Sequence, residues 1–542
     1  MDLALIRRSL FAACALAVLI GGPVAAQDLP TALKEKTAEL IKPGAARDKI
    51  REAENQAIQA FYEKREFKSL WFDGDRPNAR VKALLETLAG ADAHGLLPND
   101  YGGKSLAAKV ANHKDDARAD LELLLTRTMI TYAADLDGGR TTPARVSPDQ
   151  FVIPQRKPAP MILDGAAQAD DLAKYLDGFA PKQPEYHRLK ATLVKYRKLA
   201  ADGGWKPVAL GATLKPKMRN ARIKQVKERL LVTGELKSLG ADPELYDDDL
   251  LKAVKAFQDR HGLDADGNIG ATTLDRLNVS AAQRVEDIIM NMERRRWLPE
   301  DQGRKYIFVN VADFELKIVD GAKTIYTTRV VVGTPYHRTP LFSGTMRYVE
   351  FNPWWNVPHS IAVNEMLPTI RKDPGYLARN NYVISTRYGA ETSDVDAHAV
   401  NWSSLGPGNF PYVLRQKPGP WNALGTVLFM FPNQHNVFLH DTSSKEKFQF
   451  PERTFSHGCM RVFKPLDLAI LLLKNNKGFE RGKLQDILAS KVPLRIDLTE
   501  PLPVHVTYFT AWTNKDGEVN FRRDVYKRDA ALSVALRKAQ VQ

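Results

Sequence analysis

The spacing of hydrophobic residues changes at Tyr306, and this change divides the chain into parts with different predicted folds. Upstream, segments such as residues 50–61 carry apolar side chains at intervals of three and four residues, the period of an amphipathic helix. Residues 306–319 instead alternate in the manner of a strand, Asp320-Gly321 supplies a turn, and residues 324–332 continue as a partner strand. The sequence therefore predicts a multi-domain α+β protein whose helical region precedes a mainly β, sandwich-like domain.

The length and composition agree with several folded domains. A chain of 542 residues is too long for one compact core, and its 44% hydrophobic and 26% charged content excludes a wholly disordered protein. The predicted segments are a signal peptide (1–26), a helical scaffold (27–214), a small three-helix domain (215–278), a helix returning to the scaffold (279–301), the β domain (302–498, with a capping insertion at about 361–420) and a C-terminal strand and helix (499–542).

The first residues have the pattern of an export signal. Arg7-Arg8 forms a short basic region, residues 10–20 are apolar, and residues 24–26 offer a small-residue cleavage site before Gln27. The apolar run is short for a membrane span. Cys14 lies inside this run, where lipidation is not expected. We therefore expect a soluble exported protein that does not span the membrane after cleavage.

Removal of this segment would leave Cys459 as the one thiol of the mature chain, so an internal disulfide is not expected. A thiol flanked by His457 and Gly458, with His440 upstream, has the ingredients of a nucleophile with a base. His440 ends an apolar stretch and is followed by the polar loop 442–454, which predicts two neighbouring strands. Both histidines are candidates for the base at this point.

The same residues suggest how a reaction intermediate is stabilised, and they leave alternatives. Gly458 permits close approach of a substrate, and the successive amides of Gly458 and Cys459 could form an oxyanion pocket. The alternatives are a buried core cysteine, a zinc ligand acting with His440 and His457, and a papain-like peptidase. The last has the opposite order of cysteine and histidine. We expect neither a metal nor a cofactor.

Charge is distributed without an obvious nucleic-acid motif. The formal net charge of the chain is +14, and the basic residues are dispersed along the sequence. A dispersed positive charge suits an anionic cell-wall polymer better than nucleic acid. The basic run at residues 294–296 ends a predicted helix (285–297), where the helix dipole favours cations. We expect this run to lie on a solvated face.

The predicted three-helix domain resembles a known family. Residues 253–278 contain Phe-Gln-x-x-x-Gly-Leu at the end of a helix, an Asp-Gly turn, and Ile-Gly-x-x-Thr-Leu. This pattern resembles the small peptidoglycan-binding domain; the alternative is a helical spacer without a ligand. A calcium loop is excluded because Ile269 occupies the position of the required glycine and Asp275 that of the final glutamate.

The cysteine region also resembles a family. Residues 440–442 (His-Asp-Thr) and 456–461 (Ser-His-Gly-Cys-Met-Arg) resemble the signature of the L,D-transpeptidase (YkuD-type) catalytic domain. Residues 352–358, 416–425 and 429–433 are similar to its large multi-domain branch from Gram-negative bacteria. Smaller members of the family often carry Asn where this chain has Arg461, whereas the large branch shows Arg.

The resemblance implies a mechanism and a set of roles. Cys459 would be the nucleophile, His440 its general base, and the backbone carbonyl of Asp441 would orient His440. Gly458 would supply an oxyanion amide and His457 would line the pocket. The predicted substrate-binding residues are Arg461, Ser456, Trp355 and Asn352. The insertion at residues 361–420 would act as a lid.

The implied function is a periplasmic peptidoglycan L,D-transpeptidase, a cysteine acyltransferase of cell-wall biogenesis and cell shape that carbapenems acylate. Its donor would be a stem tetrapeptide and its acceptor the side-chain amine of a second stem, joined in a 3→3 cross-link through a thioester. Cell-wall synthases are expected partners. The alternatives are transfer to water (an L,D-carboxypeptidase), transfer to a lipoprotein lysine, and a non-catalytic peptidoglycan-binding scaffold.

Overall fold

The computed structural model describes residues 28–476 and 479–539, so the predicted signal peptide and Cys14 lie outside the described residues. The described chain forms two compact units. The first contains the described residues up to Glu86 together with Gly102–Ile130 and Pro158–Tyr175, and the second contains Thr87–Tyr101, Thr131–Lys157 and the chain from Leu176 onward. The segment boundaries expected from the sequence stay predictions.

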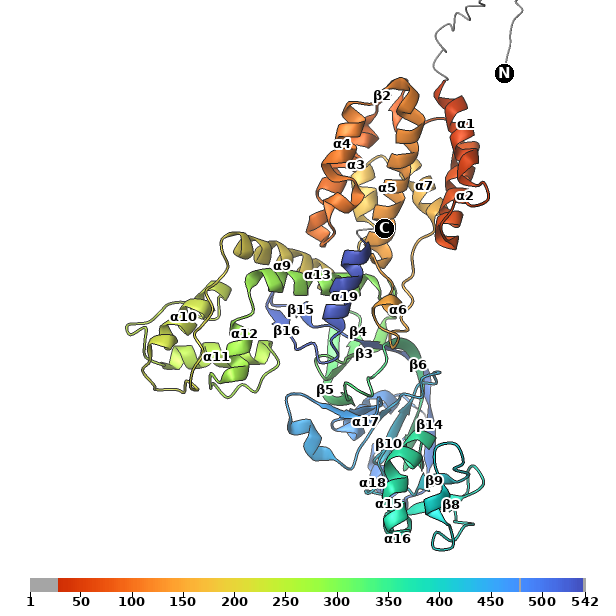
Figure 1. The fold of residues 1–542 in the computed structure, drawn as a ribbon. Coiled ribbons are helices and arrows are strands. Elements are labelled where there is room, and N and C mark those ends of the chain that lie inside the picture. The colour runs from red at the N-terminus through yellow and green to blue at the C-terminus, as the bar shows by residue number, and fades with distance from the viewer. Residues whose placement is uncertain (1–27, 477–478, 540–542) are drawn as a thin grey trace, which may run out of the picture. The chain divides into compact units, whose positions relative to one another are not determined.

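The first unit is helical, as its apolar spacing predicts (Figure 1). All or part of these elements belong to it: α1 (Leu29–Leu40), α2 (Lys49–Lys64), β1 (Phe72–Asp73), β2 (Arg76–Pro77), α3 (Ala79–Ala89), α4 (Gly103–Ala111), the 3₁₀ turn η3 (Asp115–Ala117), α5 (Arg118–Gly138), α7 (Ala159–Gln168) and α8 (Leu172–Asp177). Asp28 and Asp48 begin α1 and α2 by accepting hydrogen bonds from the N–H groups of Thr31 and Arg51.

A buried carboxylate joins the helices of the first unit. Glu122 on α5 accepts hydrogen bonds from the Tyr62 hydroxyl at 2.8 Å and from the Leu70 N–H at 2.6 Å. Its second oxygen accepts from the Ser69 hydroxyl at 2.6 Å. Burial raises the pKa of Glu122, and these donors oppose that shift. Every partner is part of the local packing, so we assign Glu122 a structural role.

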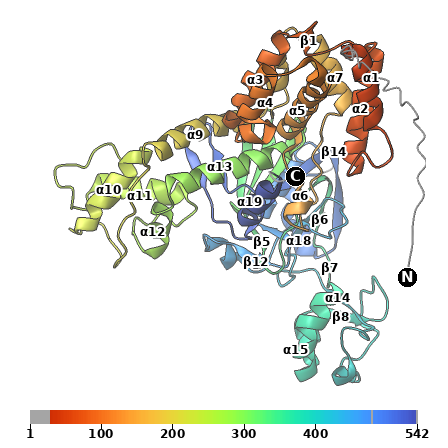
Figure 2. The same cartoon turned by 45° about the horizontal axis from the view of Figure 1, so that its top comes forward.

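The second unit begins with helices that lead to the β domain. They are η1 (Ala91–His94), η2 (Pro98–Tyr101), α6 (Pro143–Val146), α9 (Pro184–Ala201), α10 (Ala221–Thr233), α11 (Asp248–Arg260), α12 (Ala271–Leu277) and α13 (Ala281–Arg296). Helices α9 and α13 lie side by side (Figures 1 and 2). Helices α10, α11 and α12 share a separate core that includes Val226, Val254, Phe257 and Leu274. The prediction of a small three-helix unit is confirmed.

The basic run at the end of α13 corrects an expectation. Arg294, Arg295 and Arg296 are buried rather than solvated. Arg294 is paired with Asp529 at 2.5 Å and Arg296 with Glu293 at 2.9 Å. The helix dipole favours cations at the end of α13 whether or not that end is exposed. Strands and helices from distant parts of the chain cover this last turn and bury the basic run.

The β domain is built on one nine-stranded sheet. Its strands are β3 (Lys305–Asn310), β4 (Glu315–Asp320), β5 (Lys323–Gly333), β6 (Phe342–Phe351), β10 (Val427–Met430), β11 (Leu439–His440), β12 (Thr454–Ser456), β13 (Met460–Val462) and β14 (Leu494–Thr507). The strand order is β12-β5-β13-β11-β10-β6-β14-β3-β4, and β4 also pairs with β5. The expected sandwich-like form is therefore one continuous sheet whose two ends meet.

Alternation along the strands places the core on one face of this sheet. Ile307 and Val309 on β3 and Leu316 and Ile318 on β4 are fully buried in the main core. Helices α17 (Pro465–Leu473) and α18 (Leu484–Ser490) and the 3₁₀ turns η6 (Lys445–Gln449) and η7 (Arg481–Lys483) complete this part of the domain. Leu468 of α17 and Leu484 of α18 join the same core.

The segment between β6 and β10 forms a cap with a core of its own (Figure 2). It contains a three-stranded sheet of β7 (Trp355–Asn356), β9 (Val413–Gln416) and β8 (Tyr382–Ser385), together with α14 (His359–Ile361), the π-helical turn η4 (Ala362–Met366), α15 (Leu367–Lys372), α16 (Gly375–Arg379) and the 3₁₀ turn η5 (Trp402–Ser404). Its core includes Leu367, Ile370 and Trp402. Separate packing lets this insertion keep its shape independently of the main sheet.

The chain ends with the hairpin β15 (Ala511–Thr513) and β16 (Val519–Phe521) and helix α19 (Arg528–Ala539). Leu532 of α19 packs with Met290 and Trp297. The multi-domain α+β architecture expected from the sequence is confirmed. None of the described helices is long and apolar enough to cross a membrane.

We predict that Ile318→Ala lowers the free energy of unfolding of the β domain by about 2–5 kcal/mol, because it leaves a cavity in the main core. Ile325→Ala on neighbouring β5 is the matched control, since 43% of the Ile325 side chain is exposed and Ile318 is fully buried. Denaturant titration followed by circular dichroism measures both variants. Equal destabilisation by the two variants would contradict the assignment of the core face.

Candidate active site

Cys459 lies in a sharp bend between β12 and β13. Gly458 has a φ of +113°, a conformation that side chains rarely adopt. The Ser456 hydroxyl donates to the Cys459 carbonyl at 2.5 Å and accepts from the Gly458 N–H at 3.2 Å. Thr339 donates to the Gly458 carbonyl at 2.8 Å and accepts from the Gly333 N–H. Two hydroxyls therefore hold the backbone that carries the thiol.

His440 lies on the strand beside this bend, as the spacing predicts. Strand β11 pairs in parallel with β13, with Leu439 opposite Met460 and His440 opposite Arg461. Residues two apart along a strand share a face, so Cys459 and Arg461 are on the face that His440 also occupies. The structure thus brings His440, Cys459 and Arg461 together.

The backbone selects the tautomer of His440. Its Nδ1 lies 2.5 Å from the carbonyl oxygen of Asp441. A carbonyl oxygen only accepts hydrogen bonds, so Nδ1 carries the proton and Nε2 of the neutral ring has a free lone pair. The Asp441 carboxylate accepts from the N–H and the hydroxyl of Thr426, and it is paired with Lys445. Asp441 is thereby held from both sides.

Burial sets the resting charges of Cys459 and His440. It lowers the pKa of His440 to about 4, and the nearby Arg461 cation acts in the same direction. Burial also raises the pKa of Cys459, while the backbone N–H of Phe438 and the charge of Arg461 oppose that shift. The half-buried thiol lies 3.7 Å from the Asn436 carbonyl, its hydrogen-bond acceptor. At neutral pH the pair therefore rests as an uncharged imidazole and a thiol.

The predicted oxyanion donors need one correction. The Gly458 N–H is occupied by the Ser456 hydroxyl, so it does not point to a substrate. The Cys459 N–H has no hydrogen-bond partner within residues 28–476 and 479–539, which leaves it as the backbone candidate for this role. Ser456 itself is buried and holds the bend, and the prediction that it binds substrate is corrected accordingly.

Of the remaining predicted substrate-binding residues, Asn352 is buried in the structure, whereas Trp355 and Arg461 are half-buried. Asn352 is buried, and its amide donates to the carbonyls of Ile487 and Val492. It anchors backbone and is too deeply enclosed to bind substrate, which corrects the prediction. Trp355 is half-buried on β7 at the base of the cap, and Arg461 is half-buried with an Nε that has no hydrogen-bond partner among the described residues. Roles for these two in substrate binding stay predictions.

His457 faces the cap. Its Nε2 lies 2.8 Å from a carboxylate oxygen of Glu365, which belongs to the π-helical turn η4. Its ring also contacts the ring of His337, with centroids 4.7 Å apart. No local motif marks Glu365 or His337, so the sequence did not predict a role for either residue. A π-helical turn is uncommon and often occurs at functional sites. That His457 lines the substrate pocket stays a prediction.

No group of three or more His, Cys, Asp or Glu side chains is placed to hold a metal ion in the described parts of the chain. His457 interacts with Glu365 on the cap, whereas His440 is held by Asp441. The two histidines do not converge on Cys459 as ligands, so the zinc alternative loses its support. The arrangement that remains is a thiol, a neutral imidazole and a guanidinium on one face of paired strands.

Comparisons with known proteins identify three regions of the chain. Residues 304–477 match the family model of the L,D-transpeptidase catalytic domain. Residues 219–277 match the model described as "Putative peptidoglycan binding domain", and residues 56–193 match that of a scaffold domain. The chain is also 33% identical over 250 residues to a Haemophilus influenzae protein named "Putative L,D-transpeptidase". This match covers 46% of the chain and 49% of that relative.

We predict that iodoacetamide alkylates Cys459 slowly at pH 7 and faster as the pH rises, because the pKa of the thiol is raised. N-acetylcysteine is the reference thiol. Replacing Arg461 by Met should slow the reaction further, up to about ten-fold for each unit of pKa. Peptide mass spectrometry measures labelling of Cys459 itself. Rapid labelling at pH 5–6 would show a resting thiolate–imidazolium pair instead.

We predict that Glu365→Ala speeds hydrogen exchange of the amides of η4, because it removes the contact with His457. A polar contact between partly exposed side chains is worth at most about 1 kcal/mol, so the expected increase is up to about five-fold. Glu391→Ala, in an exposed loop of the same cap, is the matched control. Exchange followed by mass spectrometry measures both. Unchanged exchange in η4 would mean that the contact does not hold the cap.

Proposed function

We propose that this chain, which contains an L,D-transpeptidase catalytic domain of the YkuD type and a peptidoglycan-binding domain, joins peptidoglycan stem peptides in 3→3 cross-links through a thioester on Cys459. One observation carries the proposal. The parallel register of β11 and β13 sets His440 beside the strand of Cys459, with its Nδ1 bound to the Asp441 carbonyl and its Nε2 able to accept a proton.

The first half of the reaction forms the thioester. As the Cys459 sulfur attacks the carbonyl carbon between the third stem residue and the terminal D-Ala, its proton passes to Nε2 of His440. The Cys459 N–H donates to the oxyanion that develops. Collapse breaks the C–N bond, and the imidazolium gives its proton to the departing amine. Free D-Ala leaves, and the donor stem stays bound to the sulfur.

The second half returns the enzyme to its starting state. The side-chain amine of a second stem attacks the thioester and loses a proton to His440. The carbon–sulfur bond breaks, and the thiolate takes the proton back from the imidazolium. The new amide is the 3→3 cross-link, and no external oxidant or energy source is needed.

The electrostatics of the site support this sequence of proton transfers. A pKa of about 4 makes protonated His440 a stronger acid than a free imidazolium, so it readily gives its proton to the leaving amine, and it makes the neutral ring a weaker base toward the thiol. Arg461 disfavours the imidazolium and favours the thiolate. The charged pair is therefore formed only while the thiol attacks. In each half of the reaction His440 is the one group that relays the proton.

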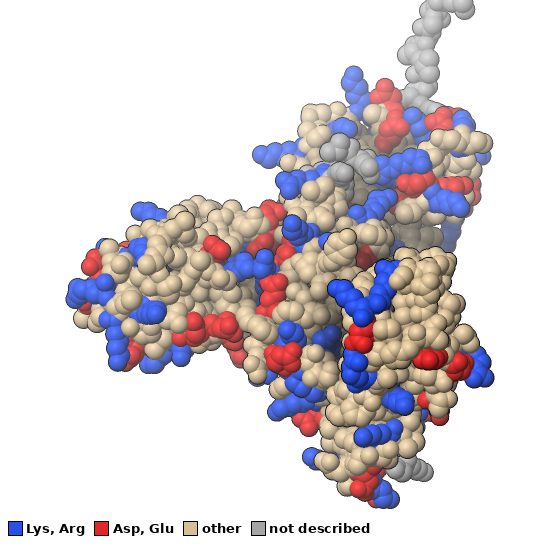
Figure 3. All heavy atoms as spheres, turned by 60° about the horizontal axis from the view of Figure 1, so that its bottom comes forward, with Lys and Arg blue, Asp and Glu red and all other residues tan. Residues whose placement is uncertain are grey.

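Other parts of the chain support a wall substrate. The cap would exclude water, which competes with the acceptor amine for the thioester. The peptidoglycan-binding domain would hold the enzyme on its polymer. Basic and acidic side chains are interspersed over the face shown in Figure 3, without a single basic stripe of the kind that binds nucleic acid. We place this activity in the periplasm, with the N-terminal segment as its export signal.

We predict that Cys459→Ala abolishes the covalent adduct formed with a tetrapeptide stem or a carbapenem, as measured by intact-protein mass spectrometry. His440→Gln should slow acylation by about 10²–10⁴-fold, because it removes the base. His435→Gln is the matched control, since that ring stacks on Phe151 with centroids 4.0 Å apart and has no place in the mechanism.

Product analysis then tests the acceptor. Purified sacculi incubated with the enzyme should yield 3→3 dimers. Tripeptide stems alone would show transfer to water, and a lipoprotein-linked stem would show transfer to a protein lysine. An unchanged yield of dimers from the Cys459→Ala enzyme would overturn the proposed chemistry. Absence of all three products from the unmodified enzyme would favour a non-catalytic wall-binding scaffold.

A further inference from the structure

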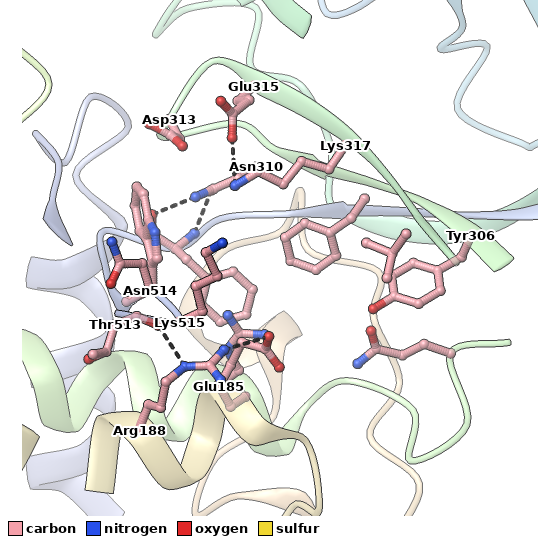
Figure 4. Close-up of a pocket in the computed structure, with 16 residues that line it drawn as sticks. Glu185, Arg188, Tyr306, Asn310, Asp313, Glu315, Lys317, Thr513, Asn514 and Lys515 are labelled. Carbon is pink, nitrogen blue, oxygen red and sulfur yellow. Dashed lines mark hydrogen bonds and ion pairs between the residues drawn. The ribbon is translucent and has the colours of Figure 1, made fainter. Parts of the chain in front are cut away.

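A cavity lies on the face of the nine-stranded sheet opposite the main core. Its lining residues are different from those of the Cys459 site. It has a volume of about 210 Å³ and is enclosed by β3, β4, the C-terminal end of α13, the start of α9 and the hairpin at β15 (Figure 4). Tyr306 and Phe308 point into it from β3, because the alternate residues Ile307 and Val309 face the core. This size suits a small molecule or the end of a peptide.

Most charged groups of this cavity already have partners. Glu185 is paired with Arg188 at 2.8 Å, and Glu315 with Lys317 at 2.7 Å. Asp313 is paired with Arg522 at 2.5 Å. Figure 4 shows Glu185 and Arg188 on the helical wall and Glu315 and Lys317 on the strand wall. These pairs neutralise one another and leave little reason for a ligand to bind them.

Arg295 is different. The residue is 7% exposed, and its guanidinium makes no hydrogen bond or ion pair with the residues that the structure describes. It lies over the ring of Phe509 at 4.2 Å and near that of Phe308 at 5.9 Å. Aromatic rings stabilise a cation only in part, and a buried charge ordinarily has an anionic partner. Glu185 attracts Arg295 from a distance, but its carboxylate is bound to Arg188.

A second unsatisfied donor lines the same cavity. Gln302 is 8% exposed, and its side-chain Nε2 has no hydrogen-bond partner within the described residues. Its backbone carbonyl accepts from His505, which fixes the residue in place. Buried polar groups in folded proteins nearly always have a partner, so two unsatisfied donors at one cavity indicate a missing acceptor.

We propose that this cavity binds a compact organic carboxylate, whose oxygens accept hydrogen bonds from Arg295 and Gln302 and whose apolar body packs on the aromatic rings. A guanidinium and an amide both donate N–H groups, the geometry that a carboxylate accepts. Phe308 and Phe509 stack with centroids 6.0 Å apart, and Tyr306 and Trp512 add two further rings to the lining. The carboxylate belongs to a free metabolite or to the carboxyl end of a peptide.

Calorimetry with the full chain tests the proposal, and three probes separate its parts. Phenylacetate carries a ring and a carboxylate, phenylacetamide is its neutral counterpart, and a blocked dipeptide ending in phenylalanine carries a free carboxyl end. We expect saturable binding of phenylacetate and at least about ten-fold weaker binding of the amide, as for loss of a charge-assisted hydrogen bond. Binding of the dipeptide as well would assign the site to peptide ends; its exclusion would assign it to free carboxylates. Absence of saturable binding, or equal binding of the amide, would overturn the proposal.

Substitutions at Arg295 and Gln302 test whether these residues bind the carboxylate. Arg295→Met should weaken phenylacetate binding by roughly ten- to hundred-fold, without lowering the unfolding temperature, since it replaces an unpaired buried cation by an apolar side chain. Lys317→Gln is the matched control, because it removes a cation that is already paired with Glu315. Gln302→Leu provides a second test if Arg295→Met does not fold. Unchanged binding in the Gln302 and Arg295 variants that fold would overturn the assignment, and the readout does not depend on acylation of Cys459.

Discussion

The parallel pairing of β11 with β13 is the constraint on which the candidate active site depends. Leu439 and Met460, both fully buried, fix the register, and the next pair along the strands is His440 with Arg461. A slip of one residue would turn His440 to the opposite face of the sheet, away from Cys459. The apolar core beneath these strands therefore determines the chemistry above them. The geometry of the candidate active site is a consequence of strand register.

The backbone around His440 and Cys459 is held by close contacts that a larger side chain would disrupt. A side chain at Gly425 would lie 2.4 Å from the Asp441 carboxylate, and φ there is +63°. Asp441 in turn orients His440 through its carbonyl. Thr339 and Ser456 hold the bend at Gly458 from the other side. The hydroxyls of Thr339 and Ser456 and the glycines at 425 and 458 thus position the backbone around His440 and Cys459. This role differs from binding substrate.

Burial supplies the other half of the design. It disfavours both the thiolate and the imidazolium, so Cys459 and His440 rest uncharged, and the backbone N–H of Phe438 and the charge of Arg461 are the groups that favour charge on the sulfur. The cap keeps its own core, and its Glu365 contacts His457, two residues before Cys459. A cap with separate packing can move as one body, so substrate entry need not disturb the strands that hold His440.

The sequence by itself determined the features that neighbouring residues encode. Apolar spacing identified the three-helix unit and the strands from Tyr306 onward, and the apolar stretch before His440 with the polar loop after it indicated two neighbouring strands in the region of His440 and Cys459. It did not determine what Ser456, Asn352 and the Gly458 amide contact, nor the burial of residues 294–296, nor the Glu365–His457 contact. Each of these depends on segments far apart in the chain. Periodicity and motifs report local backbone preference, whereas burial and hydrogen-bond partners are decided only when distant elements pack together.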